Sequence, residues 1–190
     1  MVSQRRPNME YYAVVSGRID EPTIFSSWGD AHPRVTGCSS VHKAFVALED
    51  AREYTKSKGV KEPKEVIKDG AGETTPPRGS QAFYAVAHGR KPGIYPYWHK
   101  STEPEVKEIS GACHKRFRTR SQAEAFIEDW KESFADVWRR RIREGLDQRL
   151  QPYDMKLGVE GILHGPDEQT QDEVALDEVK LDKLSLKQEE

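Results

Sequence analysis

The sequence predicts an α+β protein made of two small repeated units, a long C-terminal helix and an acidic tail. The main observation is an internal repeat, because short motifs recur 72 residues apart. The recurring pairs are Tyr12-Ala13-Val14 and Tyr84-Ala85-Val86, Gly17-Arg18 and Gly89-Arg90, and His42-Lys43-x-Phe45 and His114-Lys115-x-Phe117. A fixed internal period indicates that one structural unit, of about 50 residues here, has been duplicated. Apolar residues at helical spacing continue past the second unit, and the residues after Tyr153 include eleven acidic and four basic side chains.

Each unit is predicted to have the element order β-β-α-β-α. A short β-rich run meets a Gly-Arg turn, and a second run with aromatic residues and one Trp follows. A polar stretch able to hold a short helix ends near Val35 in the first unit and near Val106 in the second. A third strand around the His-Lys-x-Phe motif and a closing helix complete the unit. The first two strands are expected at 11–15 and 24–28 in the first unit, and at 83–87 and 94–98 in the second.

The closing helix of the second unit is predicted to start near Ser121 and to extend well beyond its unit. Ser121-Gln122-Ala123-Glu124 has the form of a capping box, in which the Ser side chain accepts from the Glu124 amide and the Glu side chain reaches back. Apolar residues at spacings of three and four keep to one face of this helix. They are Ala123, Phe126, Ile127, Trp130, Phe134, Val137, Trp138, Ile142, Leu146 and Leu150. A stripe of this size needs a cover, either the first unit or a second chain.

Between the units, a segment rich in Pro and Gly indicates a flexible linker. Its turn-forming residues are Pro63, Gly70, Gly72, Pro76, Pro77 and Gly79. We therefore expect a first unit at 9–58, a linker at 59–81, a second unit at 82–130, a helical extension at 131–152 and an acidic tail at 153–190. The tail has a net charge of −7 and only one aromatic residue, so we expect most of it to be disordered.

The composition favours a binding module over an enzyme. Units this small bury only about 60% of their unfolded surface, which leaves little room for a deep catalytic cleft. The charge differs between the units, since 9–58 has six basic and seven acidic residues whereas 82–130 has eight basic and six acidic ones. The second unit is therefore the better candidate for binding a polyanion.

No cofactor, metal or membrane segment is predicted. Cys38 and Cys113 hold different places in the repeat, so they do not indicate a disulfide framework. No Cys/His spacing of a zinc site surrounds His42 or His114, and no nucleotide-binding glycine motif appears. No apolar run approaches the roughly 18 residues of a membrane span, and the N-terminus lacks the apolar core of a secretory signal. We therefore expect an intracellular protein, with nucleus, cytoplasm and mitochondrion left open.

The second unit resembles a known family. The run Phe83-Tyr84-Ala85-Val86-Ala87-His88-Gly89-Arg90-Lys91-Pro92-Gly93-Ile94-Tyr95 is followed by Trp98, by Lys115-Arg116-Phe117 and by Ala123-Glu124-Ala125-Phe126. This pattern is similar to the N-terminal hybrid-binding domain of eukaryotic ribonuclease H1, which also occurs in caulimovirus viroplasmin. The resemblance covers nearly all of 83–127, and 11–54 matches more loosely through the internal repeat. It implies a three-stranded antiparallel sheet with two helices that binds RNA/DNA hybrids, and double-stranded RNA less tightly, across the minor groove.

The resemblance also implies roles for residues of the second unit. Tyr84 and Trp98 would pack on the sugar-phosphate backbone of the DNA strand, and Lys115 and Arg116 would lie near phosphates. His114 takes a place where the family often has an aromatic residue. The loop Gly89-Arg90-Lys91-Pro92-Gly93 would lie close to the RNA strand. Physical chemistry is consistent with this, because an A-form-like minor groove is wide and shallow and is recognised by shape. Lysine and arginine then add affinity that does not depend on base sequence.

The first unit keeps a weaker set of candidates. These are Tyr12, Gly17, Arg18, Trp28, His42 and Lys43. Ala44 replaces the second basic residue, and Ile19-Asp20-Glu21-Pro22 replaces Lys-Pro-Gly, so the presumed phosphate edge loses a cation and gains two carboxylates. This unit either binds nucleic acid weakly or serves as a scaffold. Arg139-Arg140-Arg141-x-Arg143 is either a nucleic-acid patch or the solvated face of a long helix.

The sequence thus predicts a tandem, non-catalytic protein that binds RNA/DNA hybrid or double-stranded RNA without sequence preference. Ribonuclease H cleavage needs a separate metal-binding carboxylate domain, for which we expect no room after Leu150. Two alternatives remain. One is a protein-interaction scaffold that uses the repeats and the 121–150 helix to bind a partner or a second chain. The other is an accessory subunit or paralogue of ribonuclease H1 that acts with a nuclease in trans.

Overall fold

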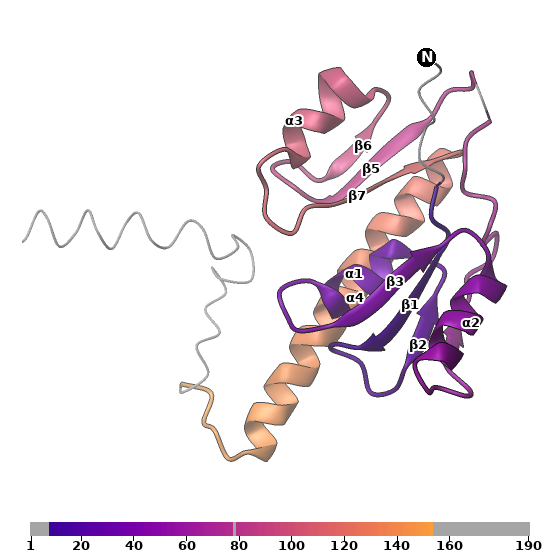
Figure 1. Cartoon of the computed structure of the whole chain (residues 1–190). Helices are drawn as coiled ribbons and strands as arrows, with labels where there is room; N and C mark the ends of the chain where they lie inside the picture. Colours follow the sequence, from indigo (N-terminus) through magenta and orange to yellow (C-terminus); the bar gives the residue numbers. More distant parts are fainter. Residues whose placement is uncertain (1–7, 78, 154–190) are drawn as a thin grey trace, which may run out of the picture. The chain divides into compact units, whose positions relative to one another are not determined.

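The computed structural model describes residues 8–77 and 79–153, which contain both repeated units, called the first and second copy below (Figure 1). The first copy consists of β1 (Tyr11–Ser16), β2 (Thr23–Phe25), α1 (Trp28–Val35), β3 (Val41–Phe45) and α2 (Leu48–Ser57), and β4 (Lys64–Val66) follows it. The second copy consists of β5 (Phe83–His88), β6 (Gly93–Tyr95), the π-helix η1 (Trp98–Thr102), α3 (Glu103–Val106), β7 (Cys113–Phe117) and α4 (Arg120–Asp147). The predicted α+β class and the order β-β-α-β-α are confirmed in both copies.

The central strands β1 and β5 organise two sheets with the strand orders β3-β1-β2-β4 and β6-β5-β7. Every pair that β1 or β5 makes is antiparallel, as the resemblance implied. The register is also repeated, because Tyr12 lies opposite Phe25 and Ala44 while Tyr84 lies opposite Tyr95 and Arg116. Directly opposed residues share one face of a sheet. The repeated Tyr therefore holds the same place on the same face in each copy.

Small changes in length explain why the two Trp residues depart from the 72-residue period. Four residues separate β5 from β6, whereas six separate β1 from β2. The helical segment that follows gains one residue, since η1 and α3 together span nine residues and α1 spans eight. A π-helix takes up this extra residue because its hydrogen bonds close over a longer turn than those of an α-helix. The loop before β7 is one residue longer than the loop before β3, which restores the period.

The two Trp residues lie at helix starts and not in strands, which corrects the sequence prediction. Trp28 is the first residue of α1, and Trp98 is the first residue of η1. Each second strand is only three residues long. Pro96 stops β6 because it has no N–H for the sheet ladder, and Ser27 belongs to the residue types favoured immediately before a helix.

The start of α4 at Arg120 is one residue from the predicted start, but its capping box is formed by different residues. The backbone N–H of Gln122 donates to the Thr119 hydroxyl at 3.2 Å, and the Thr119 N–H donates to the Gln122 side-chain oxygen at 3.2 Å. Thr119-Arg120-Ser121-Gln122 fits the same pattern as the predicted box two residues later. Glu124 instead accepts a hydrogen bond from Arg120 at 2.9 Å.

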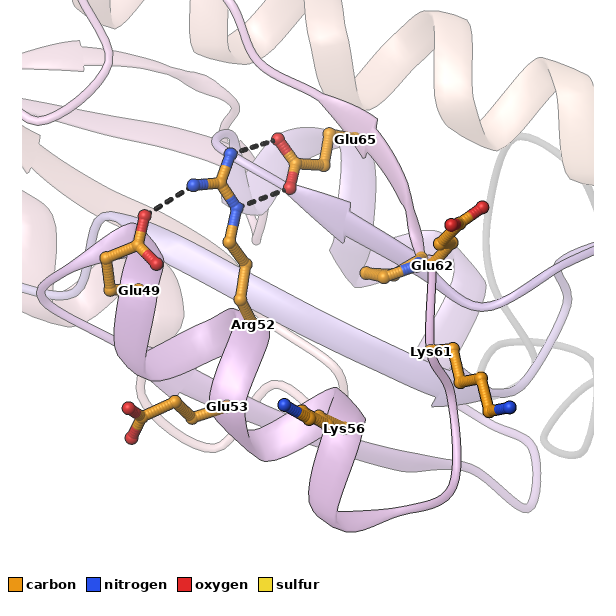
Figure 2. Close-up of a pocket in the computed structure, with 8 residues that line it drawn as sticks. Glu49, Arg52, Glu53, Lys56, Lys61, Glu62 and Glu65 are labelled. Atoms are coloured by element: carbon orange, nitrogen blue, oxygen red, sulfur yellow. Dashed lines mark hydrogen bonds and ion pairs between the residues drawn. The ribbon is translucent and has the colours of Figure 1, made fainter.

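The segment 59–81 was predicted as a flexible linker, but the structure attaches part of it to the first copy. β4 pairs in parallel with β2, which gives the first sheet a fourth strand. Arg52 of α2 holds β4 by two hydrogen bonds to Glu65, at 2.6 and 2.8 Å, and it also pairs with Glu49 (Figure 2). The strand escaped prediction because Lys64-Glu65-Val66 is short, largely charged and surrounded by Pro and Gly.

Helices cover both faces of the first sheet, and the core of the second copy lies between its sheet and α4. On the α1 side of the first sheet the buried residues are Tyr12, Val14, Phe25, Ala31 and Val35, and on the α2 side they are Ala13, Ile24 and Ala51. The core of the second copy contains Ala85, Ala87, Cys113, Phe117, Ala123 and Phe126. Trp28 packs against both the α1-side cluster and the core of the second copy. The two cores are therefore joined through one side chain.

The two copies meet where α1 contacts α4. A Cβ on Gly29 would lie only 2.6 Å from the Phe126 carbonyl oxygen and 3.0 Å from the Trp130 nitrogen, so the backbones approach as closely as a glycine permits. Further along, Arg34 donates to the Ser133 hydroxyl and pairs with Asp136 at 3.0 Å. Both copies belong to one compact unit that reaches Arg141, and the described residues from Ile142 onward belong to a second unit.

The remaining predictions on chain organisation concern the C-terminal part, the thiols and the membrane. α4 ends at Asp147, inside the predicted extension 131–152, and Arg143 pairs there with Asp147 at 3.2 Å. All but the first residue of the predicted tail 153–190 lies outside the described residues. Cys38 and Cys113 are free, and Cys113 is buried. Among the described residues, no helix is long and apolar enough to cross a bilayer.

The close contact at Gly29 predicts a large effect of adding one methyl group. We expect Gly29→Ala to lower the free energy of unfolding by about 1–3 kcal/mol, because the neighbouring atoms belong to the α4 backbone and cannot move aside cheaply. Gly93→Ala is the matched control, since its nearest neighbours are Tyr95 ring atoms at 3.7 Å, an ordinary contact distance. Urea unfolding followed by circular dichroism measures both. Equal stability of the two variants would show that α1 and α4 are not in tight contact.

Candidate nucleic-acid interface

The second copy presents three rings on one side of its sheet. Tyr84 comes from β5, His114 from β7 and Trp98 from the start of η1, and the Trp98 ring lies 5.8 Å from Tyr84 and 5.1 Å from His114. Tyr84 lies opposite Arg116 in the register, which places Arg116 on the same face. Tyr84, Trp98 and Arg116 are partly exposed and His114 is exposed. We call these four residues the open platform.

Unpaired cations accompany the open platform. In the part of the chain that the structure describes, six basic side chains of the second copy form no ion pair or hydrogen bond. They are Arg90, Lys91, Lys100, Lys107, Arg116 and Arg118. By contrast, the helical arginines of the predicted patch each have a neighbour. Arg139 pairs with Asp136, Arg140 with Asp20 and Arg143 with Asp147, while Arg141 lies over the Trp138 ring. Available positive charge is therefore concentrated in the second copy.

The repeated Gly-Arg turn has a structural role in both copies. A Cβ on Gly89 would lie 2.4 Å from the Glu105 carbonyl oxygen, and the Arg90 N–H donates to that oxygen at 2.8 Å. Gly17 has the same relation to the Arg34 carbonyl, at 2.6 Å. These two glycines let the turn pack on the end of the following helix. Gly93 has no such restriction, because a Cβ there would meet only ordinary contacts at 3.7 Å.

The two arginines of these turns have different environments. Arg18 donates to the carbonyl oxygens of Pro33, Thr36 and Gly37 at 2.9, 2.6 and 2.8 Å, and so satisfies the C-terminal end of α1. The Arg90 side chain is exposed. Arg18 was a weaker candidate for nucleic-acid contact, but its guanidinium is occupied by the protein itself.

The equivalent rings of the first copy are largely covered. Trp28 lies 5.0 Å from Tyr12 and 6.4 Å from His42, so the same cluster forms. Tyr12, however, is only 7% exposed, and Lys115 of the second copy lies over its ring at 5.5 Å. Since Trp28 also packs against the core of the second copy, two of the three rings are used to join the copies. His42 remains exposed.

Lys43 is also separated from this cluster. Its Nζ lies over the rings of Phe45 and Tyr54, at 5.4 and 5.7 Å. Tyr54 and Phe45 pack with the α2-side core, on the face opposite Tyr12. Strand alternation explains the separation, because neighbouring residues of β3 point to opposite faces.

Lys115 is buried between the copies, whereas the sequence reading had placed it near phosphates. Its side chain is 6% exposed and forms an ion pair with Glu10 at 3.5 Å. Burial lowers the pKa of Lys115, and Glu10 opposes that shift. The Thr74 and Thr75 hydroxyls donate to the Glu10 carboxylate at 2.6 and 3.0 Å. The cause is again strand alternation, since Lys115 shares its face of β7 with Cys113 and Phe117 while His114 and Arg116 point the other way.

Histidines that sequence reasoning did not single out lie between the copies. Trp130 of α4 donates from its indole N–H to Nδ1 of His32 in α1 at 3.2 Å, and its ring stacks on His88 at 5.7 Å. His88 Nδ1 in turn lies 2.8 Å from the Gly111 carbonyl oxygen. Burial lowers the pKa of His32 to about 4, with further contributions from His88 and His114. At this end, the apolar stripe of the long helix is thus covered by the first copy, one of the two covers that the sequence predicted.

Two other site types find no support. The hollow in Figure 2 lies between α2 and β4 and is lined by Glu49, Glu53, Glu62 and Glu65 together with three basic residues, of which Arg52 is already paired. With four carboxylates against three basic side chains, this hollow has no excess of positive charge to attract a polyanion. Across residues 8–77 and 79–153, no group of three or more His, Cys, Asp or Glu side chains is suited to hold a metal ion.

Comparison with known proteins agrees with this geometry. The family described as Ribonuclease H1 N-terminal domain matches residues 10–55 and 82–127. These two segments are tandem ribonuclease H1 N-terminal domains. A curated relative is Ribonuclease H of Crithidia fasciculata, which is 45% identical over 64 residues, or 30% of this chain and 13% of that protein. The chain thus spans a small part of the relative's length. No solved structure matches the chain.

Within these ribonuclease H1 N-terminal domains, sequence reasoning found the rings but missed the residues that join the copies. Glu10, Asp30, His32 and Ser133 are all at most 8% exposed and all lie at this junction. Glu10, Asp30 and His32 share one signal, because the second copy has no matching residue for any of them, whereas Ser133 lies in the helical extension outside the repeat. A polar residue specific to one copy is a candidate for a contact between copies.

Two buried groups at the junction predict opposite pH effects on the stability of the tandem. Burial and Asp129 raise the pKa of Asp30 to about 6, whereas the pKa of His32 is lowered to about 4. Between about pH 4 and 6 the unfolded chain binds more protons at His32, so acidification destabilises the fold. At Asp30 the folded chain binds more protons over this range, so acidification stabilises it.

We therefore expect the free energy of unfolding of the wild type to change little across this pH window. In Asp30→Asn the compensating group is removed, and stability should fall by up to about 3 kcal/mol as the pH drops through the window. Urea titrations at several pH values measure this. Parallel pH profiles for the wild type and Asp30→Asn would show that Asp30 does not titrate in this range.

Proposed function

We propose that this protein is a non-catalytic reader of RNA/DNA hybrid or double-stranded RNA in which the second copy contacts the duplex and the first copy is a scaffold. The observation that supports the proposal is that the repeated cluster of three rings is accessible in one copy and largely covered in the other. In the second copy Tyr84, Trp98 and His114 are accessible beside unpaired cations, whereas in the first copy Tyr12 is buried and Trp28 packs between the cores.

The open platform has the chemistry that an A-form-like duplex requires. Flat rings pack on sugars and bases without reading sequence, and a shallow minor groove admits a sheet surface rather than a helix. Arg116 on the platform and Arg90 and Lys91 on the adjoining turn supply charge for phosphates. The contact residues that we propose are Tyr84, Arg90, Lys91, Gly93, Trp98, His114 and Arg116, with Gly89 shaping the turn.

The relative's name, Ribonuclease H, suggests the setting but not the activity of this chain. The two matched segments both correspond to the N-terminal domain of ribonuclease H1. We therefore propose binding without cleavage. Self-association through the 121–150 helix remains a prediction, and its Trp130 end is already occupied by His32.

A competition titration tests the proposed function. We expect the full chain to bind hybrid and double-stranded RNA more tightly than double-stranded DNA of equal length, without sequence preference and with a steep dependence on salt. Fluorescence anisotropy with one labelled hybrid and three unlabelled competitors measures this. Because one of the two ring clusters in the described residues is open and the other is covered, a short hybrid should bind with one duplex per chain. Equal or tighter binding of double-stranded DNA would contradict the proposal.

Two matched Trp variants test the division of labour. Trp98→Ala should weaken hybrid binding by about 1–3 kcal/mol, in line with ring-to-base stacking losses, and leave the fold largely intact. Trp28→Ala should reduce the free energy of unfolding by about 3–5 kcal/mol, since it opens a cavity between the cores. Anisotropy and urea unfolding are measured on both. The division is wrong if folded Trp28→Ala loses as much affinity as Trp98→Ala.

A further inference from the structure

His114 is the one residue of the open platform whose type has an ordinary pKa close to neutral pH. It is exposed on β7 and lies 5.1 Å from the Trp98 ring, with an interplanar angle of 39°. His42 holds the same repeat position in the first copy, where its Nδ1 lies 3.1 Å from the Ser40 hydroxyl. A histidine on the surface proposed to meet phosphates can contribute a charge that a phenyl ring cannot.

The groups around His114 disfavour its charged form in the free protein. Surrounding protein atoms displace water from the ring and lower its pKa. The ionisable groups on neighbouring elements are mostly basic: Arg116 and the buried Lys115 on β7, His88 at the end of β5, and His32 on α1, whose own pKa His114 helps to lower. On the η1–α3 side, Glu103 pairs with His99 at 3.0 Å. Among the described residues, no carboxylate pairs with His114.

A bound duplex would change this balance. Each phosphate brings a negative charge to a site that has several cations and no carboxylate for His114, and an anion near an imidazole favours the protonated form. The ring is already placed on the face of Tyr84 and Arg116, so the protein need not rearrange to offer this charge. The expected ligand chemistry is therefore a phosphodiester backbone together with one proton.

We propose that His114 takes up a proton when a duplex binds, so that this chain holds RNA-containing duplexes more tightly in mildly acidic solution. The inference rests on the proposed function, because it assigns a role within the same platform. The direction follows from linkage. When the bound state binds more protons than the free state, lowering the pH favours the bound state, over the range between the free and bound titration points of His114.

The test is the pH dependence of hybrid binding by the full chain. One proton taken up changes Kd by at most tenfold per pH unit, so we expect Kd of the wild type to fall about three- to tenfold from about pH 7.5 to about pH 5.5. In His114→Phe, which keeps a ring beside Trp98, the change should be about twofold or less. At the lower pH a new cation meets a phosphate in the wild type. The slope of log Kd against the logarithm of the salt concentration should therefore steepen by about 0.9 in the wild type and stay the same in His114→Phe.

Matched controls separate the possible outcomes. His42→Phe alters the same repeat position in the covered cluster and should keep the pH dependence of the wild type. His114→Gln provides a second uncharged variant if His114→Phe does not fold, and circular dichroism checks both. Absence of hybrid binding at every pH would overturn the proposed function. Binding whose pH dependence and salt slope are the same in wild type, His114→Phe and His114→Gln would overturn this inference alone.

Discussion

The close packing of α1 against α4 is the constraint on which the rest of the unit depends. Gly29 allows the two backbones to meet, and Trp28, the residue before it, enters the cores of both copies. Small repeats bury little apolar surface when they stand alone. Sharing one large ring between two cores increases the buried area of each. The tandem arrangement is in this sense a stability requirement, and the use of each copy follows from which of its faces the shared contact covers.

The contact between α1 and α4 leaves the ring cluster of the first copy largely covered. Tyr12 and Trp28 have the same neighbours as Tyr84 and Trp98, yet Lys115 and the second core lie against them. A ring packed between cores cannot also pack on a sugar. The same repeated pattern thus gives one surface that joins the copies and one that stays open, which we propose contacts the ligand. Polar residues that occur only in the first copy, such as Glu10 and His32, bind residues of the second copy across this contact.

Much of this could be predicted from the sequence, and the limits have physical causes. The repeat, the order of elements, the rings of the platform and the start of α4 to within one residue all follow from local patterns. β4 could not be predicted, because Lys64-Glu65-Val66 becomes a strand only through its pairing with β2 and through Arg52. The capping box was placed two residues late, since two overlapping segments fit the same pattern. The burial of Lys115 and the hydrogen bonds that occupy the Arg18 guanidinium depended on contacts across the fold that local patterns do not contain.

β7 shows most directly how one short strand serves both purposes. His114, Lys115 and Arg116 are consecutive, and a motif match treats them as one basic cluster. Alternation along a strand divides them. Lys115 points to the junction, where Glu10 compensates its charge at 3.5 Å, and leaving either group without the other would be costly in a buried site. His114 and Arg116 point to the open platform, the surface that we propose contacts phosphates. The lysine at the junction and the proposed contact residues are therefore adjacent in sequence but face different surroundings, so we expect substitutions at 115 to act on stability and substitutions at 114 and 116 to act on the proposed binding.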